Sequence, residues 1–203
     1  MYHACVKRAL DLLVALAAAV TLLPLWAVVS ACVLAESPGP VFFKQQRVGK
    51  NKTCFQILKF RTMRADTPRD VPTHLLDNPE RYITRGGAFL RRTSLDELPQ
   101  LINIIKGEMS LVGPRPALWN QYDLVAERDK YGANALVPGL TGLAQMRGRD
   151  ELPIALKAAF DGEYARKISF GFDLFIIFAT AVKVLTGEGI KEGSNGKKDY
   201  TNG

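Results

Sequence analysis

Histidine and cysteine are scarce in this chain. Only His3 and His74 occur among 203 residues, so a histidine-rich zinc site or a Ser-His-Asp triad has almost no raw material. The cysteines are widely spaced and odd in number, namely Cys5, Cys32 and Cys54. They support neither a disulfide framework nor a CxxC metal site, and they fit a reducing cytosolic face best. If the protein is an enzyme, its catalysis must therefore depend on carboxylates, arginines and lysines.

Acidic residues are fewer than basic ones in this chain. The chain has 27 Lys and Arg against 20 Asp and Glu, a net charge of +7. This excess suits a polyanion such as anionic lipid, a phosphorylated substrate or nucleic acid, although general solubility also explains it. A concentrated basic stripe with interleaved aromatics is not evident, which argues against nucleic acid. With 47% hydrophobic residues, the chain can bury one core, so we expect one domain with an appendage.

Charge is missing altogether between Leu12 and Ala35. A helix of this length rises on the order of 35 Å, enough to cross a hydrocarbon core of about 30 Å. Pro24 lies at its middle, where it removes the hydrogen bond to the Val20 carbonyl and kinks or breaks the helix. Basic residues flank both ends of the segment: Lys7, Arg8, Lys44, Arg47, Lys50 and Lys52. By the positive-inside rule this favours a re-entrant helix pair, with a straight, tilted span as the alternative.

A third interpretation is a lipoprotein leader, because Val29-Ser30-Ala31-Cys32 resembles a processing site after a basic and then an apolar region. Three features oppose it. Asp11 stands at the start of the apolar run, the run exceeds the usual 7–15 residues of a leader, and uncharged sequence continues past Cys32.

Two short strands are predicted after the apolar segment. Residues 41–43 and 54–58 flank the polar turn 48–52, which is typical of a hairpin. Residues 64–82 hold many charges and three prolines, which predicts a surface excursion.

Helices are predicted further along the chain. The first runs from Asp96 to Lys106, with an apolar stripe of Leu98, Leu101, Ile102 and Ile105. Residues 138–142 form a turn-rich connector, and helices are expected at 153–167 and 173–186. The last is apolar nearly all round yet too short to span, so it is either buried or in the lipid interface. Residues 187–203 are expected to be a poorly ordered tail.

Asp96 and Glu97 form a pair of adjacent carboxylates at the expected helix start. Ser94-x-x-Glu97 matches a capping box, and Asp96 as N-cap with Pro99 in the first turn is an equally simple structural explanation. A helix N-terminus favours negative charge by ~0.3–1 kcal/mol, so the position also keeps both groups ionised. Ionised carboxylates can attack phosphorus or bind Mg²⁺.

Arginines stand close to this pair in the sequence. Arg91 and Arg92 precede it, and Arg115 is held between Pro114 and Pro116, which fix the local backbone. A rigid guanidinium is a good bidentate clamp for phosphate, whereas an isolated Pro-Arg-Pro is more simply a solvated surface turn.

Four motifs in order carry a family resemblance: Lys59-Phe60-Arg61-Thr62-Met63, Thr93-Ser94-Leu95-Asp96-Glu97-Leu98-Pro99-Gln100-Leu101, Gly107-Glu108-Met109-Ser110-Leu111-Val112-Gly113-Pro114-Arg115-Pro116 and Pro138-Gly139-Leu140-Thr141-Gly142-Leu143-Ala144-Gln145. Together they resemble the bacterial sugar transferases, the monotopic polyprenyl-phosphate phosphoglycosyl transferases. The resemblance covers nearly the whole chain to about Thr186 and is to the short form of the family.

This resemblance implies transfer of a sugar 1-phosphate from a UDP-sugar to undecaprenyl phosphate, with release of UMP. Asp96 would be the nucleophile that forms a phosphosugar-enzyme intermediate, with Glu97 and Mg²⁺ beside it, and Asp96 and Glu97 would be the metal ligands. Arg115 would offset the diphosphate charge. Further candidates for phosphate or nucleotide contacts are Lys59, Arg61, Arg91, Arg92, Gln145 and Arg149.

The implied fold is α+β and mainly helical, with a re-entrant membrane helix broken at Pro24, a small β-hairpin and amphipathic interfacial helices around an active site on the cytosolic face. The expected divisions are 1–36 for the membrane helix, 37–186 for the catalytic domain and 187–203 for the tail. The expected location is the bacterial inner membrane, with downstream membrane glycosyltransferases as partners and no nucleic acid. The alternative function is a non-catalytic membrane adaptor or lipoprotein that binds anionic ligands.

The chain departs from the family pattern at two places. Leu23 stands before Pro24 where many relatives have serine, which removes a hydroxyl that could satisfy freed backbone. Met146-Arg147-Gly148-Arg149 replaces the common Val-Asn-Gly-Arg, and the added cation is expected to alter nucleotide or sugar contacts. Near the tail, residues 189–193 resemble members that use UDP-N,N′-diacetylbacillosamine.

Overall fold

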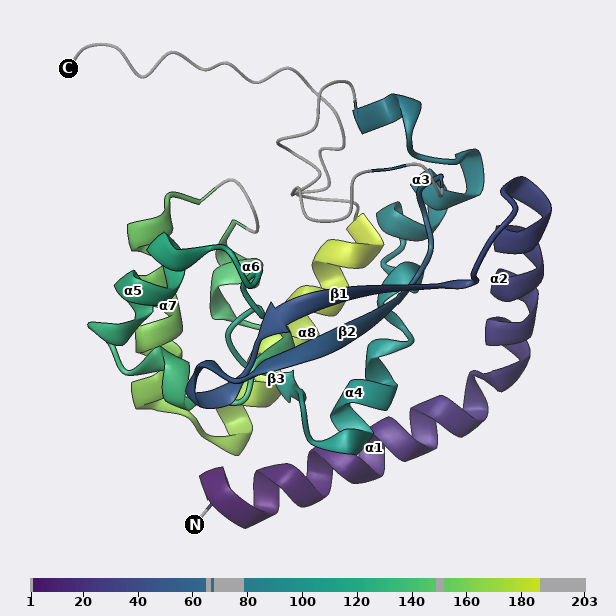
Figure 1. Ribbon diagram of the computed structural model, residues 1–203. Coiled ribbons are helices and arrows are strands. Elements are labelled where there is room, and N and C mark those ends of the chain that lie inside the picture. Colours follow the sequence, from purple (N-terminus) through teal and green to yellow (C-terminus); the bar gives the residue numbers. More distant parts are fainter. Residues whose placement is uncertain (1, 65–66, 68–78, 149–151, 187–203) are drawn as a thin grey trace.

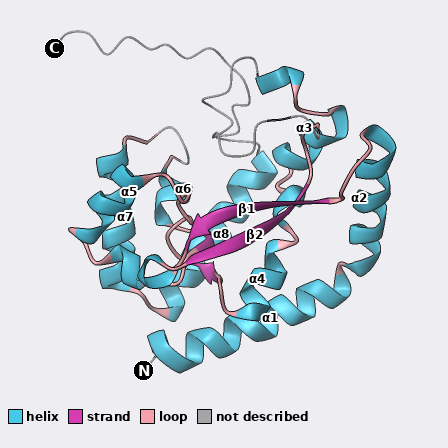
Figure 2. Ribbon diagram, in the orientation of Figure 1, coloured by secondary structure: helices cyan, strands magenta, loops and turns pink. Residues whose placement is uncertain are grey.

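The computed structural model describes residues 2–64, 67, 79–148 and 152–186. Helices dominate, as predicted for a mainly helical α+β protein. A π-helical turn (Tyr2–Val6) leads into the α-helices, which are α1 (Lys7–Thr21), α2 (Leu23–Glu36), α3 (Arg85–Arg92), α4 (Gln100–Lys106), α5 (Tyr122–Asp129), α6 (Leu143–Arg147), α7 (Ile154–Lys167) and α8 (Phe170–Thr186). The strands are β1 (Phe42–Val48), β2 (Cys54–Phe60), β3 (Ser110–Val112) and β4 (Gly139–Thr141). Figure 2 shows the strands surrounded by helices.

The apolar N-terminal segment is broken where the sequence predicts. α1 ends at Thr21 and α2 begins at Leu23, with Pro24 in its first turn, and the two helices are bent by 63°. A proline is tolerated in the first turn of a helix because it has no N–H that would be left unpaired there. Figure 1 shows α1 along one edge of the molecule and α2 turning up beside the hairpin. In the part of the chain that is described, no single helix is long and apolar enough to cross a membrane, whereas this bent pair passes that test together.

The predicted hairpin is confirmed, with strands longer than expected. β1 and β2 are antiparallel, with Phe42 opposite Phe60 and Val48 opposite Cys54. A 3₁₀ turn at Lys50–Lys52 joins them. Lys59 therefore lies one residue from the end of β2, facing the segment that carries the carboxylate pair.

A second, parallel pair of strands was not predicted. β3 pairs with β4 through Ser110 opposite Gly139 and Val112 opposite Thr141. The prediction of a plain connector at 138–142 is wrong for Gly139–Thr141. Three residues are too few to show the alternating pattern by which a strand is detected in sequence.

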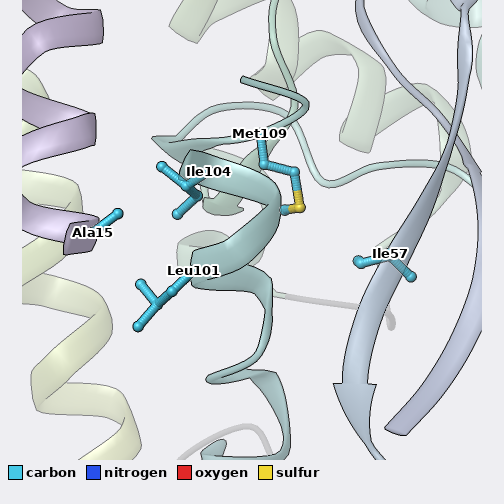
Figure 3. Packing of buried hydrophobic residues seen from close by; sticks show 5 residues of the cluster. All are labelled: Ala15, Ile57, Leu101, Ile104 and Met109. Atoms are coloured by element: carbon cyan, nitrogen blue, oxygen red, sulfur yellow. The ribbon is translucent and has the colours of Figure 1, made fainter. Parts of the chain in front are cut away.

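Helix α4 forms the centre of one core cluster. It lies between α1 and β2, and Leu101 and Ile104 face Ala15, while Met109 and Ile57 close the other side (Figure 3). The helix begins at Gln100, so the predicted start at Asp96 is wrong. Ile104, outside the predicted stripe, is fully buried because α4 is covered on two faces rather than one.

The C-terminal helices pack around a second cluster. The helix predicted at 153–167 is confirmed as α7, and the one predicted from Asp173 begins earlier, at Phe170. α8 buries Ile176 and exposes a broad apolar face: Phe170, Leu174, Phe175, Ile177, Phe178 and Val182. Most of the excursion at 64–82 and all of the tail at 187–203 lie outside the described residues.

Candidate active site

The carboxylate pair lies in a 3₁₀ turn, Leu95–Glu97, between α3 and α4. Ser94 precedes it with a left-handed φ of 57° and makes no side-chain cap bond. Pro99, not Asp96, is the N-cap residue of α4. Both capping interpretations are therefore wrong, because the tight turn and Pro99 separate the pair from the helix start.

Cations from two distant segments meet at Glu97. The Lys59 Nζ lies 2.7 Å from Glu97 Oε1 and 4.0 Å from Asp96 Oδ2. The Arg115 Nη1 lies 3.6 Å from the same Glu97 oxygen. Three of the residues predicted for phosphate and metal chemistry thus surround the predicted nucleophile.

Asp96 is the most buried member of this group, with 7% of its surface exposed. Burial raises its pKa from 3.8 to about 6, in spite of the opposing effects of Lys59, Arg91 and Arg115, while the charge of Glu97 adds to the rise. The helix-terminus argument for an easily ionised group therefore does not hold. With a pKa near 6, Asp96 is still mostly ionised at neutral pH, and its carboxylate is poorly hydrated.

The loop that carries Arg115 is fixed by close backbone contacts. Gly113 donates to the Thr141 carbonyl (2.9 Å), and a Cβ at Gly113 would lie 2.5 Å from the Val137 carbonyl. Gly139 in turn donates to the Pro114 carbonyl at 2.9 Å. The Arg115 side chain therefore projects from a backbone segment that cannot shift without breaking the β3–β4 pair.

Known proteins resemble this chain along its length. The family described as "Bacterial sugar transferase" matches residues 2–187. The chain belongs to this family. The exopolysaccharide production protein ExoY of Sinorhizobium fredii is 38% identical over 197 residues, which cover 90% of this chain and 87% of ExoY. The UDP-glucose:undecaprenyl-phosphate glucose-1-phosphate transferase of Xanthomonas campestris pv. campestris is 38% identical over 191 residues, covering 91% of this chain and 40% of that protein.

The name of a third relative specifies a different sugar. It is the UDP-N-acetylgalactosamine-undecaprenyl-phosphate N-acetylgalactosaminephosphotransferase of Aeromonas hydrophila, 35% identical over 195 residues that cover 93% of this chain and 46% of the relative. The chain is thus an enzyme of the transferase class.

The remaining predicted site residues of this sugar transferase have other partners. Arg91 donates from Nε to Thr62 Oγ1 (2.8 Å) and still lowers the pKa of Asp96. The Arg92 guanidinium lies 5.9 Å from the ring centre of Phe89.

Arg61 and Gln145 contact backbone. Arg61 is buried and donates to the carbonyls of Ser37 and Pro38, the latter at 2.8 Å. Gln145 donates to the Leu140 carbonyl at 3.0 Å. Arg149 lies outside the described residues.

The two departures from the family pattern have structural partners. Met146 belongs to the second core cluster, and the Arg147 guanidinium lies 5.5 Å from the centre of the Phe160 ring. The helix breaks at Leu22 although Leu23 supplies no hydroxyl.

A further arginine, which no sequence pattern indicated as a site residue, holds the other side of the Arg115 loop. Arg47, on β1, donates from Nη1 to the Pro116 carbonyl at 3.1 Å. No local signal marks it, because a basic residue on a short strand is most simply explained as solvated.

The carboxylate oxygens of Asp96 and Glu97 are ligands of the kind that a hard cation such as Mg²⁺ prefers. Among the described residues, no group of three or more His, Cys, Asp or Glu side chains is close enough to hold a metal. Asp96 and Glu97 are nevertheless adjacent carboxylates, and Mg²⁺ commonly binds through one or two carboxylates together with substrate phosphates.

Proposed function

We propose that this sugar transferase moves a sugar 1-phosphate from a UDP-sugar to undecaprenyl phosphate and releases UMP. The observation that carries the proposal is the buried Asp96 carboxylate beside Glu97, on which Lys59 and Arg115 converge. Supporting it, two of the relatives are named as undecaprenyl-phosphate transferases of glucose 1-phosphate and of N-acetylgalactosamine phosphate.

The reaction proceeds in two displacements. An Asp96 carboxylate oxygen attacks the β-phosphorus, the bond from that phosphorus to the bridging oxygen breaks, and UMP leaves with the oxygen. An oxygen of the lipid phosphate then attacks the same phosphorus, and the Asp96–phosphorus bond breaks. The product is a lipid-linked sugar diphosphate, and the carboxylate is restored. Splitting the transfer into two steps allows each substrate to be activated separately.

The cations serve both displacements. Lys59 and Arg115 are 2.7 Å and 3.6 Å from a Glu97 oxygen, close enough to the carboxylate pair to contact a diphosphate bound at Asp96. Asp96 and Glu97 would hold Mg²⁺, which supplies further neutralisation of phosphate charge. The charge of Arg91 lowers the pKa of Asp96 and so favours its ionised form.

We further propose that the enzyme is monotopic in the bacterial inner membrane, with its site on the cytosolic face. The 63° bend, the basic residues at both ends of the helix pair and the apolar outer face of α8 support this arrangement. Lipid phosphate then reaches Asp96 at headgroup depth, and the lipid-linked product passes to downstream membrane glycosyltransferases.

The direct test is the Asp96→Asn variant. We expect it to release no UMP from UDP-sugar in the presence of lipid phosphate and Mg²⁺, while it stays in the membrane fraction. Asp129→Asn is the matched control, because Asp129 is an exposed carboxylate at the end of α5. Unchanged turnover in Asp96→Asn contradicts the assignment, and a wild-type enzyme that is inactive with a full panel of UDP-sugars favours a non-catalytic adaptor.

A further inference from the structure

A buried ion pair joins α5 to α7 behind the Arg115 loop. Arg128 is 5% exposed and Asp161 is 1% exposed. The Arg128 Nε donates to Asp161 Oδ2 at 2.8 Å, and the Arg128 Nη2 lies 2.6 Å from the same oxygen as an ion pair. A buried pair of this kind gains little over well-packed apolar residues, because both ions lose their hydration. Stability alone therefore does not explain it.

The pair makes a third contact, and this one leads to the active site. The Arg128 Nη2 also donates to the main-chain carbonyl of Arg115 at 2.9 Å. The side chain of Arg115 lies 3.6 Å from Glu97. A continuous series of contacts thus links Asp161, through Arg128 and the Arg115 backbone, to the carboxylate beside the nucleophile.

Three successive carbonyls of the Pro-Arg-Pro loop are held from three different elements. The Pro114 carbonyl accepts from Gly139 at the start of β4, the Arg115 carbonyl from Arg128 on α5, and the Pro116 carbonyl from Arg47 on β1. The two prolines have no N–H to donate, so their peptide units are held through these acceptor contacts, in addition to the Gly113–Thr141 bond. The central one belongs to the residue whose side chain reaches Glu97.

We propose that Arg128 and Asp161 are a positioning pair that sets the direction of the Arg115 guanidinium toward the substrate diphosphate. The inference rests on the proposed function. Asp161 fixes the planar fork of Arg128, and the fork fixes the Arg115 backbone. The competing explanation is that the pair only fastens α5 to α7.

The decisive experiment is a double-mutant cycle between the pair and Arg115. Arg128→Met/Asp161→Leu removes both charges together, so it leaves no unpaired ion. The part-buried Arg115 carbonyl loses its donor, and we expect the melting temperature to fall by only a few degrees. We expect kcat/KM for the UDP-sugar to fall ~10- to 100-fold, the loss that small misplacements of a binding group produce. Adding Arg115→Ala should then reduce it by less than about twofold further. Losses that multiply would overturn the proposal.

Arg128→Lys provides a second variant that is easier to fold. It keeps a cation opposite Asp161 but lacks the fork that reaches two acceptors. We expect it to lose most of the activity that the apolar double variant loses, and wild-type activity in Arg128→Lys would overturn the proposal. The matched control is the exposed pair Lys52–Asp129, whose separation is 2.6 Å. Lys52→Gln/Asp129→Asn should leave kcat/KM unchanged.

Equilibrium binding of UDP separates this inference from the proposed reaction. We expect the Arg128 and Arg115 variants to bind UDP more weakly than wild type by similar factors. Equal UDP affinity in wild type and Arg128→Lys would contradict the positioning pair. A wild-type enzyme that binds UDP but releases no UMP from any UDP-sugar would contradict the reaction and leave the binding result valid for the pair.

Discussion

In the proposed reaction Asp96 must be ionised to attack phosphorus, and its burial shifts the pH at which this happens. Because burial raises its pKa to about 6, the reactive form is about a tenth of the population at pH 5 and about nine tenths at pH 7. We expect kcat/KM for the UDP-sugar to rise with pH, with a midpoint near 6. A pH profile between 5 and 8 measures this. A midpoint near 4 would show that Asp96 is hydrated rather than buried.

Because of the same burial, ionisation of Asp96 lowers the free energy of unfolding. A carboxyl whose pKa is raised in the folded state contributes stability while protonated, and this contribution is lost as pH rises from about 4 through about 6. The amide of the Asp96→Asn variant does not titrate and has no such loss, so this variant should be more stable than wild type at pH 7.5, by on the order of 1–3 kcal/mol. Thermal unfolding at pH 4.5 and 7.5 tests this. A stability difference that does not change with pH would contradict it.

At the residue scale, the order of the four sequence motifs predicted more of the site residues than the spacing of neighbouring residues did. Asp96, Glu97, Lys59 and Arg115 were predicted together, and the structure brings them together. The pair Arg128 and Asp161 could not be predicted, because 33 residues separate them and each alone is typical of a solvated helix face. Long-range pairing depends on how α5 packs on α7, which no local pattern specifies.

At the element scale, the end of the helix pair is attached to the hairpin through one side chain. Arg61, at the end of β2, donates to the carbonyls of Ser37 and Pro38 just after α2. We expect Arg61→Lys to lower the free energy of unfolding by about 2 kcal/mol, because one buried carbonyl loses its donor. The KM for the UDP-sugar should not change.

Lys44→Ala, on the exposed side of β1, is the control for this loss of stability. The opposite pattern, a raised KM with unchanged stability, would support the sequence prediction that Arg61 contacts nucleotide.

Elements with a clear pattern were predicted, and short ones were not. The hairpin, α7, α8 and the break near Pro24 followed from periodicity, turn residues and proline chemistry. The start of α4 was misplaced because Ser94 and Glu97 match a capping box that the tight turn at Leu95–Glu97 replaces. The β3–β4 pair depends on a contact between segments about 30 residues apart, so it has no local signature.

At the scale of the whole molecule, the bent pair predicts a topology that native cysteines can report. Cys5 precedes the apolar segment, Cys54 follows it, and both are exposed. In variants that keep one of these two cysteines, we expect a membrane-impermeant maleimide to label neither in intact spheroplasts and both in inverted vesicles. Labelling of Cys5 alone from outside would show a straight span.

The complete site selects which sugar is transferred, and activity with a panel of nucleotide sugars identifies that sugar. UDP-glucose and UDP-N-acetylgalactosamine are the donors in the names of the relatives, and UDP-N,N′-diacetylbacillosamine is the one indicated by residues 189–193. We expect one of these to release UMP well above the others. Equal rates would show that the site recognises the nucleotide and diphosphate alone.

The central claim is that Asp96 carries the phosphosugar between its two substrates. Intact mass measurement of the enzyme after incubation with its UDP-sugar and Mg²⁺, without lipid phosphate, tests it most directly. We predict a mass increase of one sugar phosphate in wild type, close to one UMP released per enzyme, and neither in Asp96→Asn. An unmodified wild-type enzyme that turns over normally once lipid phosphate is added, or an adduct that persists in Asp96→Asn, would contradict the account.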